Sequence, residues 1–255
     1  MLFDKIIFGP IQSRRLGLSL GVNLLSPTAK LCNFDCIYCE CGWNKTSPGG
    51  TFNNSLEVIE ALEAKLIQMK NEGKAPDTIT FAGNGEPTMH PQFAEIISKT
   101  IDLRNTIAPL CKISVLTNAT MINRPEVAQA LLKVDQNILK LDSAIDATYE
   151  IINMPKNTRT VDQQIELLKQ FSGQGIIQTM LLKGTNEQGI DVDNTTEKEI
   201  SALINAIKEI KPTKIMLYSL DRIPPTSTLV QIPHSQLVDI ANTITTATGI
   251  EVVTT

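Results

Sequence analysis

The stretch Leu31–Gly42, LCNFDCIYCECG, places Cys32, Cys36 and Cys39 in a C-x3-C-x2-C pattern within one short loop. Thiolates are soft ligands, and three of them in one loop can converge on a zinc ion or an iron–sulfur cluster. A four-iron cluster held by only three cysteines keeps one iron without a protein ligand, and chemistry can occur there, as it does at the open position of a catalytic zinc. The pattern therefore predicts a catalytic metal centre in loop 31–42, with these three cysteines as its ligands.

The pattern resembles the signature of the radical S-adenosylmethionine (radical SAM) enzymes, which also carry an aromatic residue just before the third cysteine. Here that residue is Tyr38. Within this superfamily, the segment FGPIQSRRLGLSLGV at 8–22, followed by CNFDCIYC, looks like the small iron–sulfur oxidoreductases related to the tricyclic-wyosine tRNA synthases. The resemblance continues through FAGNGEPT and VLTNAT in the middle of the chain and fades after about Leu182.

The resemblance implies two cofactors, a [4Fe-4S] cluster and S-adenosylmethionine. In such enzymes the reduced cluster binds the amino and carboxylate groups of S-adenosylmethionine at its free iron and transfers one electron to the sulfonium. The products are methionine and a 5′-deoxyadenosyl radical, which abstracts a hydrogen atom from the substrate. An external electron donor such as a flavodoxin or ferredoxin is implied as a partner.

The composition indicates a cytoplasmic protein of one domain. The chain has 255 residues, of which 42% are hydrophobic, so it can bury a full core. The sequence carries neither a secretion signal nor an apolar run long enough to span a membrane, so we expect no membrane association. An odd number of cysteines, three of them clustered, argues against a disulfide framework and for a reducing compartment.

The charge disfavours a nucleic-acid partner without excluding one. The net charge is −4 and aromatic residues make up 4% of the chain, whereas nucleic-acid binding draws on basic patches and stacking aromatics. A basic pair, Arg14-Arg15, precedes the first predicted strand. A salt-bridged surface pair is the favoured interpretation of these two residues, and a contact to an anion or to the substrate is the alternative.

Short β-branched runs alternate with amphipathic helical patterns, which is typical of consecutive βα units. Polar residues follow the carboxyl ends of these runs, the edge at which barrel enzymes build their sites. We therefore expect an α/β fold, and the resemblance implies a partial (β/α)6 barrel of the radical SAM type in one domain, 1–255. The six predicted strands are 18–25, 77–81, 112–116, 138–141, 176–182 and 214–220.

Three helix starts carry capping signals, at Asn54, Thr160 and Thr196. Each of these residues is followed three positions later by Glu or Gln, the pattern of a capping box. Two further helices are predicted, one from about Pro91 and one over 234–248.

Polar residues after the predicted strands are candidates for binding S-adenosylmethionine. Gly83, Asn84, Gly85 and Glu86 resemble the Gly-Gly-Glu motif that holds the methionyl amine, although Asn84 replaces the middle glycine. The resemblance implies that Tyr38 borders the adenine of S-adenosylmethionine. The remaining candidates resemble the strand ends that contact the ribose and the carboxylate: Thr117, Asn118, Asp142, Ser143 and Lys183.

Other interpretations of these residues stay open. The cysteines could hold a structural zinc ion with Cys41 as a fourth ligand, although structural zinc sites more often use paired Cys-x2-Cys knuckles. Strand-end Asx and Ser/Thr residues often serve only as turn formers. Cys111 is expected to be a small buried hydrophobe. Trp43 could cover a cluster, meet a partner or pack in the core.

The substrate is open at this stage. A barrel without an added C-terminal domain leaves a lateral entrance, which favours a protein or peptide substrate. The first alternative is modification of a tRNA base, indicated by the family resemblance and disfavoured by the acidic charge. The second is a non-enzymatic iron–sulfur or zinc protein that uses the cysteine loop for structure.

Overall fold

The computed structural model describes residues 2–44, 50–156, 158–222 and 224–255. The chain divides into two compact units. The N-terminal unit comprises Met1–Cys32, Asn44–Thr117 and Met121–Asn137. The C-terminal unit comprises Asn33–Trp43, Asn118–Thr120 and Ile138–Thr255.

A mainly parallel sheet forms the core of the N-terminal unit. Its strands, in spatial order, are β1 (Ile7–Ser13), β2 (Gly17–Val22), β3 (Thr78–Phe81) and β4 (Lys112–Thr117). Strands β2, β3 and β4 run parallel, and β1 pairs antiparallel with β2. Leu20, Ile79 and Ile113 are register partners on the three parallel strands, and each is completely buried. Burial of this kind is typical of parallel strands covered by helices.

The side chains that alternate with these apolar residues are hydroxyls. Ser19 pairs with Thr80 across β2 and β3, with 2.7 Å between their oxygens. Thr78 pairs in the same way with Ser114 across β3 and β4, at 2.8 Å. Because successive side chains of a strand point to opposite faces, the sheet has one apolar face and one polar face on which the buried hydroxyls satisfy each other.

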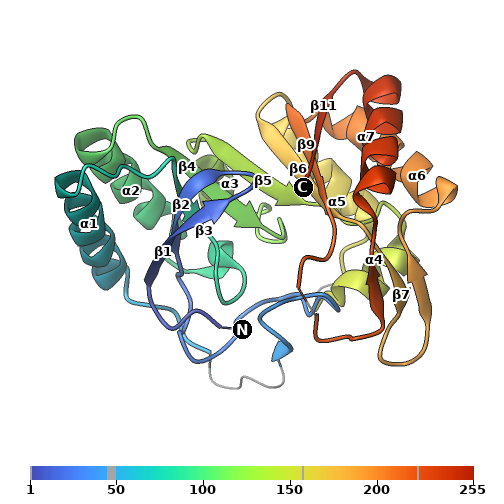
Figure 1. Cartoon of the computed structure of the whole chain (residues 1–255), viewed down its shortest axis with the longest axis horizontal. Helices are drawn as coiled ribbons and strands as arrows, with labels where there is room; N and C mark the ends of the chain where they lie inside the picture. Colours follow the sequence, from blue (N-terminus) through green and yellow to red (C-terminus); the bar gives the residue numbers. More distant parts are fainter. Residues whose placement is uncertain (1, 45–49, 157, 223) are drawn as a thin grey trace. The chain divides into compact units, whose positions relative to one another are not determined.

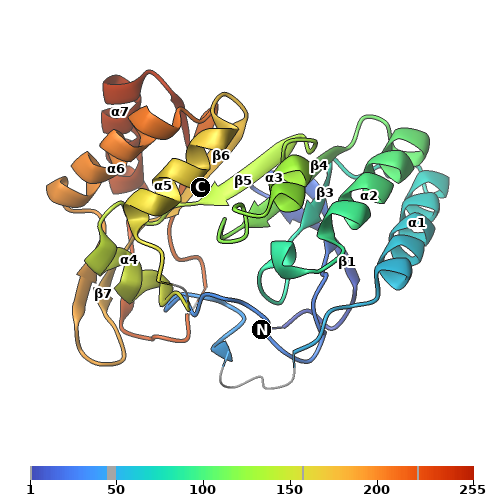
Figure 2. The same ribbon diagram turned by 180° about the vertical axis from the view of Figure 1, so that it is seen from behind.

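Helices pack beside this sheet. Figures 1 and 2 show α1 and α2 lying side by side along it. Both helices bury apolar stripes, which include Leu62 and Leu66 on α1 and Ile96 and Ile97 on α2. The helical elements of this unit are α1 (Ser55–Asn71), the short η2 (Pro87–Met89), α2 (Phe93–Ile107) and α3 (Pro125–Leu131).

The C-terminal unit has a parallel sheet and a smaller antiparallel one. The parallel strands are β6 (Gly175–Met180), β9 (Lys214–Tyr218) and β11 (Glu251–Thr254), in that order. The small sheet has the order β10 (Leu229–Gln231), β7 (Leu182–Thr185) and β8 (Asp191–Asp193). The strand β5 (Gln136–Lys140) contains the division between the two units. The helices are α4 (Asp146–Asn153), α5 (Val161–Leu168), η3 (Lys169–Phe171), α6 (Glu197–Ile210) and α7 (His234–Thr248).

The core of the C-terminal unit includes part of the cysteine loop. Ile37 is buried in a cluster with Ile152 of α4 and Leu182 of β7. Tyr38 and Trp43 pack against the same cluster and are partly buried. Trp43 thus makes the core contact that was one of its three interpretations, and apolar contacts hold the loop in place alongside its hydrogen bonds.

All six predicted strands are present, with small shifts at their ends, and the helix predicted over 234–248 is α7. Strand β1 was missed because it contains Pro10, and its pairing with β2 slips between Phe8 and Ile11. Proline cannot donate to a ladder, so its presence argues against a strand unless a bulge accommodates it. The other elements that the sequence did not indicate are short: η2, α3, α4, η3, β7, β8, β10 and β11.

The predicted helix caps are present. The Asn54 side chain accepts from the backbone of Leu56 and Glu57. Thr160 and Gln163 form the complete reciprocal box. Thr196 accepts from Glu199 N, but the Glu199 carboxylate bonds to other side chains, so this box is half formed.

No helix among the described residues combines the length and the apolar character needed to cross a membrane.

Gly85→Ala is expected to destabilise the protein, because a Cβ at this position would lie 1.8 Å from Leu31 O and the residue has φ +145. We expect a loss of at least about 2 kcal/mol in the free energy of unfolding. Gly73→Ala is the matched control: Gly73 also has positive φ, at +67, but nothing lies within 4 Å of its added Cβ. Its expected loss is about 1 kcal/mol. Equal losses in urea denaturation of the two variants would contradict the close approach at Gly85.

Candidate functional site

In the N-terminal unit, the turn after β3 is paired with the residue that precedes the first cysteine of the motif. Leu31 N donates to Asn84 O at 2.8 Å, and Glu86 N donates to Leu31 O at 3.1 Å. Gly85 forms an isolated parallel bridge with Leu31. The glycine is required by this close approach, and the pairing fixes the backbone that leads into Cys32.

Asn84, the departure from the Gly-Gly-Glu pattern, has a structural role. Its side chain is completely buried. Its Nδ2 donates to Phe3 O and Ser26 O, both at 2.8 Å, and its Oδ1 accepts from Phe3 N at 2.8 Å. Asn84 thus fastens the N-terminal segment to the turn and needs no ligand to satisfy its side chain.

Glu86 is held in place by hydroxyls and by the backbone of η2. It is 2% exposed, and its Oε1 accepts from Thr88 N at 3.0 Å and from the Thr88 hydroxyl. The same oxygen accepts from Thr117 Oγ1 at 2.6 Å. The structure thus brings together two of the predicted cofactor-binding residues, Glu86 and Thr117. A carboxylate oriented in this way can pair with a cationic ligand such as an ammonium group.

In the C-terminal unit, the cysteine loop is fastened to the last turn of α4. Asp35 N donates to Asn153 O and Ile37 N donates to Ile152 O, both at 3.0 Å. Within the loop, Cys39 N donates to Cys36 O at 3.0 Å. The backbone around Cys36 is therefore fixed by the protein itself.

Tyr38 takes part in a network of polar side chains beside Cys36. Its hydroxyl donates to Asp142 Oδ2 at 2.6 Å, and the Lys140 ammonium contacts both the Tyr38 hydroxyl and Asp142. Asn153 Nδ2 donates to Asp142 Oδ2 at 2.8 Å and to Cys36 Sγ at 3.7 Å. The network connects the predicted residues Tyr38 and Asp142 with a cysteine of the motif.

Asp142 and Lys140 form the charged centre of this network. Burial works to lower the pKa of Lys140, but the attraction of the Asp142 carboxylate, with smaller contributions from Cys36 and Tyr218, outweighs it, so the pKa lies above its usual range. The other carboxylate oxygen of Asp142 accepts from Met180 N at 3.0 Å. Lys140 forms an ion pair with Asp142, and its ammonium balances the charge of the buried carboxylate.

The remaining predicted residues have different surroundings. Asn118 Nδ2 donates to Asn33 Oδ1 at 2.7 Å, so Asn118 contacts the residue that follows Cys32 in the chain. The Ser143 hydroxyl donates to Glu199 Oε2 at 2.7 Å, which fastens the start of α4 to α6. Lys183 lies in β7, paired with Asp193 of β8. None of these contacts tests whether Asn118, Ser143 or Lys183 binds S-adenosylmethionine, so these three roles stay predictions.

The cysteines of the motif fit a thiolate-bound metal centre by their chemistry. Cys32, Cys36, Cys39 and Cys41 are partly exposed thiols. Cys111, in contrast, is buried as expected, and burial raises the pKa of its thiol to about 12. Among the described residues, no group of three or more His, Cys, Asp or Glu side chains stands ready to hold a metal ion. The case that these residues suit a metal centre therefore rests on the thiol groups of the cysteines and on the hydrogen bond from Asn153 to Cys36.

The comparison with known families covers most of this region. A family model described as "Radical SAM superfamily" matches residues 26–214, which include the cysteine loop and the turn at 83–86. The chain belongs to this superfamily. Membership supports an enzyme, and the family implies a [4Fe-4S] cluster and S-adenosylmethionine as cofactors.

Curated relatives are about one third identical to the chain. A UPF0026 protein of Helicobacter pylori is 31% identical over 221 residues, which are 85% of this chain and 67% of that protein. A protein named GTPase Obg of Brachyspira hyodysenteriae is 31% identical over 228 residues, which are 87% of this chain. The chain spans only 31% of the length of this second relative.

Solved structures confirm the predicted fold class, a partial barrel of the radical SAM type. A radical SAM methyltransferase from Sphaerobacter thermophilus matches with a TM-score of 0.71 and 13% identity, over 93% of this chain and 65% of that one. Streptococcus suis SuiB bound to the precursor peptide SuiA matches with a TM-score of 0.64 and 17% identity, over 89% of this chain and 47% of that one. At 13% and 17% sequence identity, these similarities establish a shared fold.

The sequence did not indicate Lys140 and Asn153 as residues of this region. A signal existed for Lys140, because it lies two positions before Asp142 and alternate residues of a strand share a face. No local pattern singles out Asn153, the last residue of a short helix. Its position depends on how α4 packs against the cysteine loop.

Proposed function

We propose that the protein binds a [4Fe-4S] cluster through Cys32, Cys36 and Cys39 and uses it to cleave S-adenosylmethionine reductively. The bound cluster would supply one electron, and the resulting 5′-deoxyadenosyl radical would take a hydrogen atom from a substrate. The observation that carries this proposal is the family match over residues 26–214, which spans the cysteine loop. The fastening of that loop by the turn at 83–86 supports it. A flavodoxin or ferredoxin is the proposed electron donor.

The chain's own residues would bind and orient S-adenosylmethionine. Glu86 offers a buried carboxylate, oriented by Thr88 and Thr117, to the methionyl ammonium. Tyr38, held by Asp142, would border the adenine. Gly83, with φ +141, is needed for this turn, because an added Cβ would lie 2.6 Å from Asn23 Oδ1.

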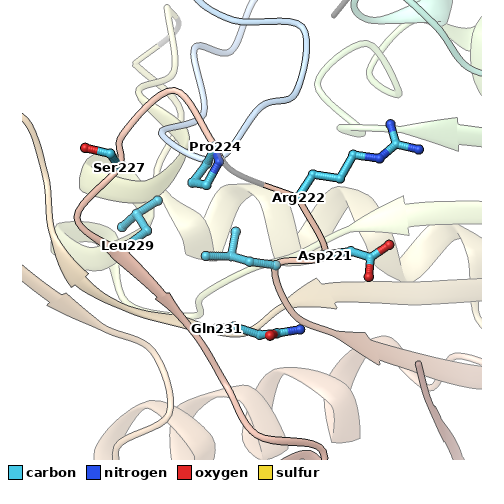
Figure 3. A pocket seen from close by; sticks show the side chains of 7 residues that line it. Asp221, Arg222, Pro224, Ser227, Leu229 and Gln231 are labelled. Carbon is cyan, nitrogen blue, oxygen red and sulfur yellow. The ribbon is translucent and has the colours of Figure 1, made fainter.

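We propose further that the substrate is a protein or peptide. A cavity of about 310 Å³ lies in the C-terminal unit, along the segment that follows β9 (Figure 3). Asp221 and Arg222 lie on one side of it and Ser227 on the other. Its full lining is Leu220, Asp221, Arg222, Pro224, Ser227, Leu229 and Gln231.

The cavity adjoins the cysteine loop through an ion pair. Arg222 Nη1 lies 2.7 Å from an oxygen of Glu40, which stands between Cys39 and Cys41. Both side chains are largely exposed, so the pair adds little stability. The ion pair does show that the cavity lies next to the cysteine loop. A substrate would have to approach this loop to meet a radical formed there.

The character of the cavity supports a peptide. Its volume is at the lower end of the range for small-ligand sites, about 300–1,000 Å³. Apolar side chains, both signs of charge and an amide line it, which suits a side chain or a short polypeptide segment. Asp221 and the net charge of −4 do not favour a polyanion. Modification of tRNA is therefore the less favoured alternative.

Glu86→Gln is expected to weaken S-adenosylmethionine binding at least about tenfold, which is about 1.4 kcal/mol. The substitution removes the negative charge, while the amide oxygen can still accept from Thr88 and Thr117. Iron content and thermal stability should therefore stay close to wild type. Equilibrium dialysis of the reconstituted protein with labelled S-adenosylmethionine measures the affinity.

Glu199→Gln is the matched control for this variant. Glu199 is also a buried carboxylate that accepts from hydroxyls, those of Ser143 and Thr148. It is expected to keep wild-type affinity. Equal affinities of wild type and Glu86→Gln would refute the ammonium-binding role of Glu86.

A protease-sensitive substrate is expected in cell extract. Reconstituted, reduced enzyme is incubated with S-adenosylmethionine and a heat-treated extract of the source organism, and 5′-deoxyadenosine is quantified. We expect the extract to raise its formation at least about tenfold, a change of about 1.4 kcal/mol in the barrier. Protease treatment of the extract should abolish the increase, and ribonuclease should leave it unchanged. A ribonuclease-sensitive increase would favour tRNA instead, and one that resists both treatments would exclude both macromolecules.

A further inference from the structure

The helix α4 ends against the cysteine loop in a way that fixes one side chain beside Cys36. Besides the two backbone bonds described above, Lys156 N donates to Asn33 O at 2.9 Å. Backbone hydrogen bonds thus run from both sides of Asn153 to the loop. The backbone of Asn153 is therefore fixed beside the backbone of the loop that carries Cys36.

The amide nitrogen of Asn153, and not its oxygen, faces the sulfur. Nδ2 donates to Cys36 Sγ at 3.7 Å and to Asp142 Oδ2 at 2.8 Å. A carboxylate and a thiolate accept hydrogen bonds, so both contacts require the nitrogen. The two hydrogens of the amide are then divided between Asp142 and Cys36.

This arrangement leaves Asn153 Oδ1 buried. The whole residue is 0% exposed, and Oδ1 has no hydrogen-bond partner among the described residues. Leaving a buried acceptor unsatisfied costs about 1–3 kcal/mol. An apolar side chain would avoid this cost, so the contacts of Nδ2 explain why an asparagine occupies the position.

We propose that Asn153 is a positioning residue that tunes the cluster bound by Cys36. Its N–H donor stabilises negative charge on the sulfur and thereby makes the cluster easier to reduce. Hydrogen bonds to ligand sulfurs are among the main determinants of iron–sulfur potentials. The inference rests on the proposed function, because it requires that Cys36 ligates a cluster.

The charges of Asp142 and Lys140, which lie beside Asn153, balance each other, so the Asn153 amide is the group that acts on the Cys36 sulfur. Asp142 accepts a hydrogen bond from Asn153 Nδ2, and its negative charge alone would make the cluster harder to reduce. The Lys140 ammonium forms an ion pair with Asp142 and balances that charge. Asp142 can therefore orient the amide without opposing its effect on Cys36.

The test is the midpoint potential of the reconstituted cluster, measured by redox titration with electron paramagnetic resonance in the absence of S-adenosylmethionine. Leucine has nearly the same shape as asparagine and no N–H donor. In Asn153→Leu the equilibrium constant for one-electron reduction of the cluster is expected to fall about tenfold. For a one-electron couple this corresponds to a potential about 59 mV more negative. Asn153→Ser, which keeps an O–H donor, should lie between the two.

Asn194→Leu is the matched control. Asn194 is buried in the same unit, and its amide donates to the backbone oxygens of Asp142 and Met180 instead of to a sulfur. It should lose stability and keep the wild-type potential. A wild-type potential in Asn153→Leu, or an equal shift in Asn194→Leu, would overturn the proposal.

Loss of the cluster in both Asn153 variants, with the cluster retained in Asn194→Leu, would also overturn it, because Asn153 would then be needed for cluster binding itself. Failure of the wild-type protein to form a cluster is a separate result. It would refute the proposed function, whereas an unchanged potential in Asn153→Leu refutes only the tuning role.

Discussion

The cysteine loop is held by backbone hydrogen bonds, and the rest of the site depends on this constraint. In the N-terminal unit, Leu31 is bonded to Asn84 and Glu86 on either side of Gly85. In the C-terminal unit, residues of the loop are bonded to the last turn of α4. Fixing the backbone of a residue costs about 1–2 kcal/mol of conformational entropy. The folded protein therefore fixes the backbone at Leu31, Asp35 and Ile37 without a metal ion.

The same contacts give several residues two functions. The turn at 83–86 fastens the loop through its backbone and presents the Glu86 carboxylate through its side chain. The α4 terminus fastens the loop and presents the Asn153 amide. Apart from Asn153 Oδ1, the buried polar atoms named here are hydrogen-bonded to other protein groups, which makes the surroundings rigid. Rigid surroundings are what a site needs to direct a reactive radical at one atom of its substrate.

Much of the fold could be predicted because its signals are local. β-branched runs mark the buried parallel strands, and Asn54 and Thr160 cap the helices that their sequences indicate. The spacing of the three cysteines likewise lies within one loop. The contacts of Lys140 with Tyr38 and of Asn153 with Cys36 could not be predicted, because they depend on packing between segments that are far apart in the sequence. The Asn84 substitution was recognised, but its role required the position of Phe3, which no local pattern indicates.

The central claim is that this chain performs radical chemistry with S-adenosylmethionine at a cluster held by the three cysteines. Its most direct test is anaerobic reconstitution with iron and sulfide, reduction with dithionite and an assay for 5′-deoxyadenosine formed from S-adenosylmethionine. The account predicts that the wild-type protein forms 5′-deoxyadenosine and that Cys36→Ala forms none. A protein that takes up a single zinc ion, builds no cluster and leaves S-adenosylmethionine intact would contradict it.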